Sequence, residues 1–361
     1  MARKYDMTKQ IVLPFMEIFQ DMRIPTTRYQ GSKAKLVDWI WENIKDLVFA
    51  SALDAFGGTG VVGYYLKQKG KQVFYNDYLK SNYYIGTALI ENNTVRLSEE
   101  EIEKLLTKDQ NYEYCSFIAE TFEDIYYTQE ENEWLDIVVQ NIKRMENIYK
   151  KTLAYYALLQ ACLVKRPFNL FHRKNLYLRF ARVKRTFGNK ATWDRPFEEH
   201  FMDFIREINY LVFDNGKENK AYNMDVVEIE GEFDLVYIDP PYTSSKGVSV
   251  DYKNFYHFLE GLVSYERWRS MIDYKTINKR FPRDSNPWNN KSKIRKKFKE
   301  LFENFRNSIL VVSYRSDGIP SIQQIESDLK LFKKHVHVHT YDNYKYVLSN
   351  SRTSEILIIG E

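Results

Sequence analysis

The sequence predicts an α/β protein whose sheet-forming segments lie at the two ends of the chain, on either side of a mainly helical insertion. A strand–glycine turn–helix–strand unit near the N-terminus and short apolar runs after residue 216 predict the sheet. Between them the chain is helical in pattern and rich in aromatic residues. We therefore expect one α/β domain over 1–95 and 216–361 and a helical, basic insertion over 96–215.

The elements of the first α/β segment follow from apolar spacing and a glycine-rich turn. They are a helix over 36–47, a strand over 52–56, a glycine turn over 57–60, a helix over 61–69 and a strand over 72–75. The turn joins a strand directly to a helix, so these elements make one βαβ unit. Asn76 and Asp77 follow its second strand.

Helical patterns continue through the middle of the chain, and strands return toward its end. The expected helices are within 98–164, with 153–163 apolar enough to be buried, and at 201–213 and 322–331. The expected strands are near 222, at 233–238 and 308–313, and in a terminal hairpin of 335–340 and 355–359.

Composition places the chain among globular proteins. It has 361 residues, of which 44% are hydrophobic and 28% charged. Its two cysteines, Cys115 and Cys162, lack metal-ligand spacing, so we expect free thiols in a reducing compartment and no metal site. The apolar run 11–15 is too short for a signal peptide or a membrane span, which predicts a cytoplasmic protein without membrane contact.

Two basic blocks suggest a polyanionic partner. The segments 165–195 and 275–299 each hold ten Lys and Arg residues and one acidic residue, although the whole chain carries a net charge of only +4. A solvated lysine-rich face is the alternative. The first block also contains aromatic and asparagine residues, which can contact bases. Its candidates for nucleic-acid contact are Arg166, Asn169, His172, Arg173, Asn175, Arg179 and Arg182.

The segment 237–242 reads Tyr-Ile-Asp-Pro-Pro-Tyr and follows an apolar strand. Asp239 can accept a hydrogen bond, the two prolines stiffen the turn and remove its N–H donors, and Tyr242 offers a flat ring. Together they suit the binding of a planar ring through its exocyclic amino group. A chance surface turn of the same composition is the alternative.

The glycine turn belongs to the sequence Asp-Ala-Phe-Gly-Gly-Thr-Gly at 54–60. It lacks the Lys-Ser/Thr of a phosphate-binding loop and the glycine spacing of dinucleotide-binding proteins. Glycine lets the backbone approach a ligand closely, and Asp77 can bond the two hydroxyls of a ribose. Many nucleotide-binding folds share this layout.

The order of these motifs resembles that of the amino-methylating DNA methyltransferases, specifically the adenine-N6 group of Dam-type and many restriction–modification enzymes. The resemblance covers 25–95 and 220–360 and includes Tyr29-Gln-Gly-Ser-Lys33. It implies a Rossmann-like S-adenosylmethionine-dependent sheet with helices on both faces and a terminal antiparallel hairpin. It also implies that the insertion recognises DNA.

The resemblance assigns site residues by position. Those expected to contact S-adenosylmethionine are Tyr29, Lys33, Asp54, Phe56, Gly58, Gly60, Asp77, Asp225 and Asp239. The expected catalytic residues are Asp239, Pro240 and Tyr242. Asp225 could equally be a helix or turn cap.

The chemistry follows from the properties of an aromatic amine, whose lone pair is delocalised. Asp239 and the Pro240 carbonyl would accept the two amino hydrogens, so that the nitrogen can attack an activated methyl group. A base within duplex DNA is out of reach, so it would be flipped out and would stack on Tyr242. No metal is needed, and a restriction endonuclease acting on the same site is a plausible partner.

Several alternatives remain open. A cytosine-N4 methyltransferase would more often carry Ser at position 239, and a protein-glutamine methyltransferase would more often carry Asn there. An RNA adenine as the target and a nucleic-acid-binding module without catalysis are not excluded. Glycine spacing disfavours a nicotinamide-dependent oxidoreductase. After the Asp-Pro-Pro-Tyr, we expect core packing for Phe255 and Phe258 and a position nearer the site for Tyr256 and His257.

Overall fold

The sheet predicted from the two ends of the chain is present in the computed structural model, which describes residues 24–26, 31–181, 190–243, 251–283, 286–342 and 353–361. Seven strands pair in the order β3-β2-β1-β4-β5-β7-β6. The first five are parallel, and β7 runs antiparallel to both β5 and β6. The α/β class and the terminal antiparallel hairpin are therefore confirmed.

Both faces of the central strands are buried, as expected for parallel strands, whereas the edge strand β6 is largely exposed. The strands are β1 Ser51–Asp54, β2 Gln72–Asn76, β3 Lys220–Tyr222, β4 Leu235–Ile238, β5 Ile309–Arg315, β6 Val336–Tyr341 and β7 Glu355–Gly360. In β4, Leu235 and Tyr237 belong to one hydrophobic core, whereas Val236 and Ile238 belong to another. This alternation follows from the two-residue period of a strand and gives each face its own core.

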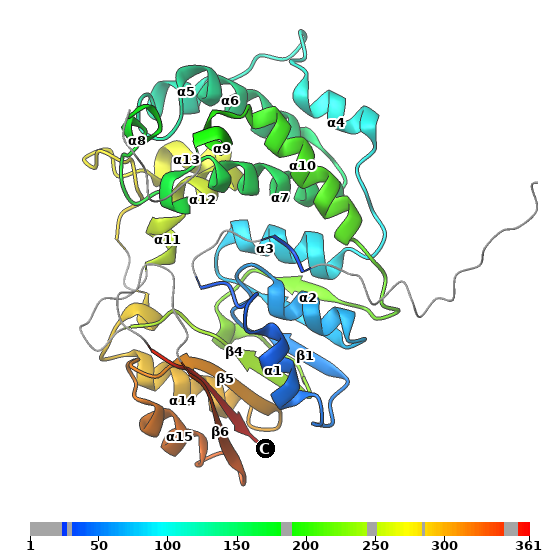
Figure 1. Ribbon diagram of the computed structural model, residues 1–361, viewed down its shortest axis with the longest axis vertical. Coiled ribbons are helices and arrows are strands. Elements are labelled where there is room, and N and C mark those ends of the chain that lie inside the picture. Colours follow the sequence, from blue (N-terminus) through cyan, green and yellow to red (C-terminus); the bar gives the residue numbers. More distant parts are fainter. Residues whose placement is uncertain (1–23, 27–30, 182–189, 244–250, 284–285, 343–352) are drawn as a thin grey trace, which may run out of the picture.

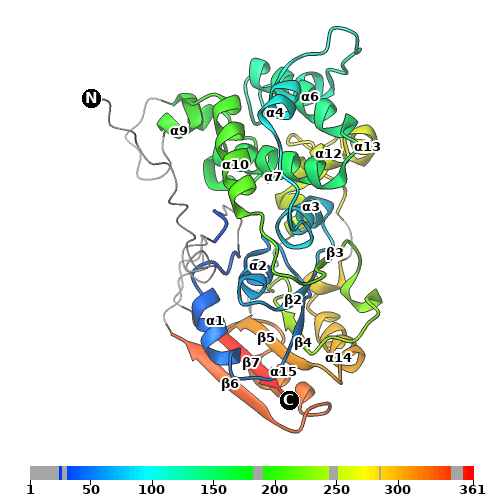
Figure 2. The same cartoon turned by 90° about the vertical axis from the view of Figure 1, so that its right-hand side faces the viewer.

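Helices cover the two faces separately. Residues of α1 Val37–Ile44 and α2 Val61–Gln68 join the first core, and those of α14 Ile294–Asn304 and α15 Ile322–Leu329 join the second. Figure 2 shows α1 and α14 on opposite sides of the strands. The cores therefore place a helical layer on each face of the sheet, as the resemblance implied.

A helical region stacks on one end of this α/β unit (Figure 1). Its helices are α3 Lys80–Gly86, α4 Glu99–Leu106, α5 Phe117–Thr121, α6 Gln129–Arg144, α7 Ile148–Val164, α8 Tyr177–Phe180, α9 Lys190–Asp194, α10 Phe197–Leu211, α11 Tyr252–Phe255, α12 His257–Val263 and α13 Tyr265–Met271. Shorter helical turns lie at Thr87–Glu91, Pro167–Asn169, Val226–Glu228 and Pro287–Asn289. As predicted, α7 is a buried helix, since every side chain from Thr152 to Val164 is buried.

The helical region is not built from the middle of the chain alone. Helices α12 and α13 follow the Asp-Pro-Pro-Tyr in sequence, yet they lie beside α5–α7 (Figure 1). One continuous core contains Tyr155 of α7, Phe258 of α12 and Tyr75 of β2. The domain division at 96–215 therefore stays a prediction, and two later helices pack with the helices of that segment.

Local sequence sets where the long helices begin. Thr128 accepts a hydrogen bond from the Glu131 N–H while the Glu131 carboxylate accepts one from the Thr128 N–H, and this pair starts α6. Ser98 and Glu101 start α4 in the same way. These reciprocal bonds satisfy N–H groups that a helix start leaves without partners.

Candidate active site

A cavity of about 330 Å³ lies where the strand order reverses, between β1 and β4. Ligands of open α/β sheets bind at this point, outside the carboxyl ends of the strands. The cavity is lined by the glycine turn and by side chains predicted from sequence, among them Lys33, Asp54, Phe56, Asp77, Asp225 and Asp239. The proposed cofactor residues and the Asp239 carboxylate thus share one space.

The glycine turn needs its glycines for two different reasons. Gly58 and Gly60 have φ values of 52° and 73°, a region that favours glycine. At Gly57 a Cβ atom would lie 2.0 Å from the Tyr75 ring, so no side chain fits. Gly57 lines the cavity although the sequence analysis did not single it out, whereas Gly60 lies outside the cavity lining and starts α2.

Asp77 at the end of β2 ties the turn to the next helix. Its carboxylate accepts hydrogen bonds from the Gly58 N–H at 2.9 Å, the Leu79 N–H at 2.7 Å and the Asn82 amide at 3.2 Å. Burial raises the pKa of Asp77 to about 6 despite these bonds. Because the side chain also lines the cavity, its remaining lone pairs can accept from a ligand.

The other two predicted acids have structural bonds as well. Asp54 accepts a hydrogen bond from the Gly63 N–H at 3.0 Å, and its burial raises its pKa to about 7. Asp225 accepts from the Val227 N–H at 3.3 Å and caps a short helical turn. Asp225 is therefore a cap that also lines the cavity, and its contact with the cofactor stays a prediction.

Asp239 belongs to a buried charge cluster. The Lys33 ammonium lies 2.9 and 2.8 Å from its two carboxylate oxygens and 3.5 Å from the Glu355 carboxylate. The Tyr242 hydroxyl donates to Asp239, and the Ser313 hydroxyl donates to Glu355 at 2.6 Å. Lys33 is 4% exposed and Glu355 is fully buried, while Asp239 keeps 16% of its side chain accessible toward the cavity it lines.

This arrangement sets the electrostatics of the Asp239 carboxylate. Burial raises the pKa of Asp239, and the ammonium of Lys33 opposes that rise. With both carboxylates ionised, the three charged groups sum to −1, which favours positive charge developing in the cavity. Glu355 was missed as a member of the cluster because only the pairing of β5 with β7 brings it to Lys33.

Tyr242 is placed differently from the prediction of a base-stacking ring. Its ring is 6% exposed, packs edge-on against Tyr314 at 5.3 Å, and is not part of the cavity lining. Its hydroxyl is therefore a contact that orients Asp239. Pro240 is buried and Pro241 lines the cavity, while Tyr29 lies outside the described residues.

The expectation for the aromatic segment after the motif is confirmed for Phe258, which is fully buried in the core, but it was wrong for Tyr256 and His257. Tyr256 and His257 are fully buried, whereas Phe255 is only partly so. The His257 Nε2 lies 2.8 Å from the Tyr126 hydroxyl, and burial lowers the pKa of His257 to about 3, so the ring is neutral. Tyr252, at the start of this segment, lines the cavity together with its neighbours Asp251 and Lys253.

Three predicted DNA-contact residues are interior residues. Arg166 is 1% exposed and donates to the carbonyls of Leu170 and Arg173, and its burial lowers its pKa to about 10. Asn175 is 7% exposed, and its amide donates to the Pro167 carbonyl. Both side chains are interior and most of their bonds are made within the protein, which argues against base contact.

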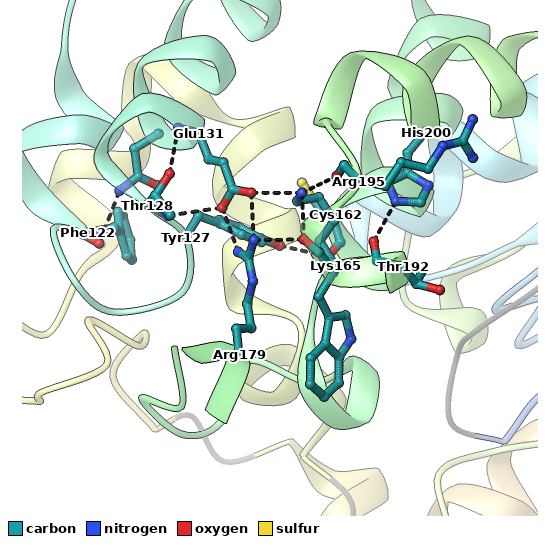
Figure 3. A network of polar contacts seen from close by, with 12 residues as sticks. Phe122, Tyr127, Thr128, Glu131, Cys162, Lys165, Arg179, Thr192, Arg195 and His200 are labelled. Carbon is teal, nitrogen blue, oxygen red and sulfur yellow. Dashed lines mark hydrogen bonds and ion pairs between the residues drawn. The ribbon is translucent and has the colours of Figure 1, made fainter. Parts of the chain in front are cut away.

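Arg179 is the third predicted DNA-contact residue that lies in the interior, and it anchors the basic block. Its guanidinium lies 2.6 and 2.7 Å from the two oxygens of Glu131, and Lys165 lies 2.8 Å from the same carboxylate (Figure 3). Both cations also donate to the Trp193 carbonyl. One carboxylate, shared by two buried cations, holds α8 and α9 on α6 and α7.

The rest of the block divides by exposure. Arg173 is exposed, and Asn169 and His172 are half-buried. Arg182 lies outside the described residues.

Within the described ranges no group of three or more His, Cys, Asp or Glu could hold a metal ion. Nor does any helix of the described part have both the length and the apolar character needed to cross a membrane.

Comparison with known proteins identifies the family. A sequence profile of the D12 class N6 adenine-specific DNA methyltransferases matches residues 29–317. That match spans the glycine turn, the helical region and the Asp-Pro-Pro-Tyr. The chain belongs to this family. Its members use S-adenosylmethionine and methylate adenine in DNA, so this activity and this cofactor are those of the chain.

Individual methyltransferases support the same assignment. The chain is 31% identical over 257 residues to Type II methyltransferase M2.HphI of Haemophilus parahaemolyticus, covering 68% of the chain and 73% of the relative. It is 27% identical to Modification methylase StsI of Streptococcus sanguinis (84% and 46%) and 28% identical to Type II methyltransferase M.FokI of Planomicrobium okeanokoites (88% and 48%). The chain thus spans about half the length of the last two.

The shared carboxylate of Glu131 generates a stability prediction. Glu131→Gln leaves Lys165 and Arg179 buried without an anion, which typically costs about 3–5 kcal/mol. Burial alone would raise the pKa of Glu131, but the bonds and charges of Arg179 and Lys165 outweigh it and lower the pKa. The contribution of the Glu131 carboxylate to the free energy of unfolding is therefore full above the pKa of a glutamate in the unfolded chain. It is lost as the pH falls through the pKa of Glu131 in the folded protein.

Urea unfolding of both proteins across acid and neutral pH measures this difference. We expect the free energy of unfolding of Glu131→Gln to be lower than that of the wild type at neutral pH, and we expect this difference to shrink in acid. Glu100→Gln, which alters an exposed i,i+4 pair with Lys104, is the matched control and should unfold like the wild type. Equal stability of Glu131→Gln and wild type at neutral pH would contradict the structural role of the network.

Lys33 generates a prediction about the pH dependence of methyl transfer. Because its ammonium lowers the pKa of Asp239, Lys33→Met should raise that pKa further. The carboxylate would then be protonated at higher pH, and the acid limb of the pH–rate profile would move upward. Single-turnover methylation measured across pH tests this, with the exposed Lys35→Met as control; an unmoved acid limb would argue against the coupling.

Proposed function

We propose that this chain is a site-specific methyltransferase that modifies N6 of an adenine flipped out of duplex DNA. The observation that carries the proposal is the single cavity that joins the glycine turn to the Asp239 carboxylate. A methyl donor and a base must meet for transfer, and two separate pockets could not bring them together. The family fixes the base and the donor, while the residue roles and the flipped geometry are part of the proposal.

The cavity wall fits S-adenosylmethionine in shape and chemistry. Gly57 and Gly58 leave room for close approach, since a side chain at Gly57 would overlap Tyr75. Asp77 offers a carboxylate for ribose hydroxyls, and Asp225 lies on the same wall for the adenine of the cofactor. Phe56 packs edge-on against Trp288 at 4.8 Å and presents an apolar surface beside them.

Asp239 performs the chemical role. S-adenosylmethionine supplies an activated methyl group, and the target amine must be made nucleophilic. Asp239 accepts one amino hydrogen, the Pro240 carbonyl accepts the other, and the net negative cluster stabilises the charge that grows on nitrogen. Lys33 and the Tyr242 hydroxyl hold the carboxylate in orientation. Its raised pKa also suits Asp239 to receive the proton released afterwards.

A role in a restriction–modification system follows from the relatives. M2.HphI, StsI and M.FokI are named as type II methyltransferases or modification methylases. We infer that this chain likewise protects a recognition sequence, with an endonuclease that cuts the same sequence as partner. The exposed Arg173 and the basic segment 275–299 supply positive charge for the DNA backbone.

Asp239→Ala tests the catalytic assignment. Removing the acceptor should lower single-turnover methylation of adenine by about 100-fold or more, because preorganised polar contacts of this kind contribute that much. Binding of S-adenosylhomocysteine, followed by calorimetry, should change little. Asp46→Ala, an exposed aspartate, is the control. A near wild-type rate for Asp239→Ala with intact cofactor binding would refute the mechanism.

Asp77→Asn tests the cofactor assignment. A hydrogen bond to a charged group contributes about 1.5–3 kcal/mol, so the Kd for S-adenosylhomocysteine should rise about 10- to 150-fold. The amide keeps an acceptor for the Gly58 N–H, which limits damage to the turn. DNA affinity should stay within twofold. An unchanged cofactor Kd would show that Asp77 only shapes the loop.

A further inference from the structure

A second cavity, of about 550 Å³, adjoins the catalytic one. The two share Asp251, Asn286 and Asn289 in their linings. The remaining wall comes from three parts of the chain: His172 of the first basic block, Asn254 and Phe255 of α11, and Asn278, Arg280, Arg283 and Asn290 of the second block. The cofactor and the methyl-transfer chemistry use none of these.

The second cavity contains buried polar atoms without partners. The Oδ1 atoms of Asn254 and Asn289 and the Nδ1 of His172 are buried and make no hydrogen bond within the described part of the chain. Asn254 is 6% exposed, and its Nδ2 donates to the Asp251 carboxylate at 2.8 Å, which fixes the amide so that Oδ1 is its free acceptor. A buried polar atom left unpaired costs about 1–3 kcal/mol, which a bound group could recover.

Other amides of the wall are already engaged. Asn286 accepts from the Trp288 N–H at 2.9 Å, Asn290 accepts from the Ser292 hydroxyl at 2.7 Å, and Asn278 donates to the Phe171 carbonyl at 3.2 Å. These bonds hold the loop around the cavity in shape. Asn254 and Asn289 are thus the asparagines of the wall that have a buried oxygen available.

The donor and acceptor pattern distinguishes between two parts of DNA. A phosphodiester only accepts hydrogen bonds, so it would satisfy Arg280 and Arg283 but leave the two asparagine oxygens unpaired. A nucleobase edge carries both donors and acceptors and can satisfy both kinds of group. The rings of His172 and Phe255, with centroids 5.3 Å apart, add a flat apolar surface on the same wall.

We propose that the second cavity holds a base of the recognition sequence close to the target adenine. Asn254 and Asn289 accept from its donor groups, and Arg280 and Arg283 donate to its acceptors or to its phosphate. This inference rests on the proposed function, because the base can lie there only when DNA occupies the adjoining catalytic cavity. The two asparagines are then specificity-determining residues rather than catalytic ones.

Methylation-sensitive sequencing of DNA from cells that express each variant tests the proposal. Wild type should give one motif with methylated adenine, which confirms the proposed function independently. Asn254→Ala and Asn289→Ala should methylate a motif that is relaxed at one position. Discrimination against the wrong base there, measured by single-turnover rates on paired oligonucleotides, should fall about 5- to 150-fold, equivalent to 1–3 kcal/mol.

Matched controls separate base reading from charge and from folding. Asn111→Ala and Arg267→Gln alter exposed residues outside both cavities and should keep the wild-type motif and rate. Thermal unfolding and S-adenosylhomocysteine binding check that each variant is folded. Asn289→Ala decides the test if Asn254→Ala is unstable, since the Asn289 amide oxygen has no bond to lose.

Two outcomes would overturn the inference alone. An unchanged motif with uniformly weaker DNA binding would show that the cavity contacts only the backbone. An unchanged motif and rate in both asparagine variants would show that the cavity does not read DNA. A wild-type protein that methylates no adenine would instead refute the proposed function, and the inference with it.

Discussion

The active-site end of the structure depends on how two carboxylates are kept inside it. Asp239 and Glu355 lie on either side of the Lys33 ammonium, and Glu355 has no access to water. Removing charge from water is costly unless partners replace the solvent, so Lys33, Ser313 and Tyr242 must all be in place. Distant segments of the chain are thereby fixed around the Asp239 carboxylate.

Strand order makes that arrangement possible. Reversal of the strand order between β1 and β4 opens a space at the carboxyl ends of these strands. Strand β7 pairs with β5 and thereby brings Glu355 to the edge of this space. The helical region adds Glu260 of α12, whose carboxylate accepts from the Lys80 and Ser81 N–H groups at the start of α3. This contact therefore ties α12 to the start of α3, which follows Asp77 and the end of β2 in the chain.

Local sequence was enough to predict the parts of the fold and of the site that depend on neighbours in the chain. Apolar runs and glycine chemistry located the strands, the turn and the Asp239 motif because those signals act over a few residues. Tertiary pairing decided the rest. Nothing near Glu355 in sequence shows that it contacts Lys33. The burial of Arg166 and Arg179 could not be predicted from charge either, because in sequence an arginine with a partner inside the protein looks the same as one that faces solvent.

The burial of several cations changes how the first basic block, residues 165–195, should be understood. In the first block, Lys165, Arg166 and Arg179 are structural cations: they satisfy carbonyls and a buried carboxylate and thereby fix the short helices α8 and α9. A rigid support of this kind holds His172 against Phe255 at the edge of the second cavity. The buried arginines thus hold in place the segment that carries His172, and charge density by itself does not show which arginine of the block is exposed.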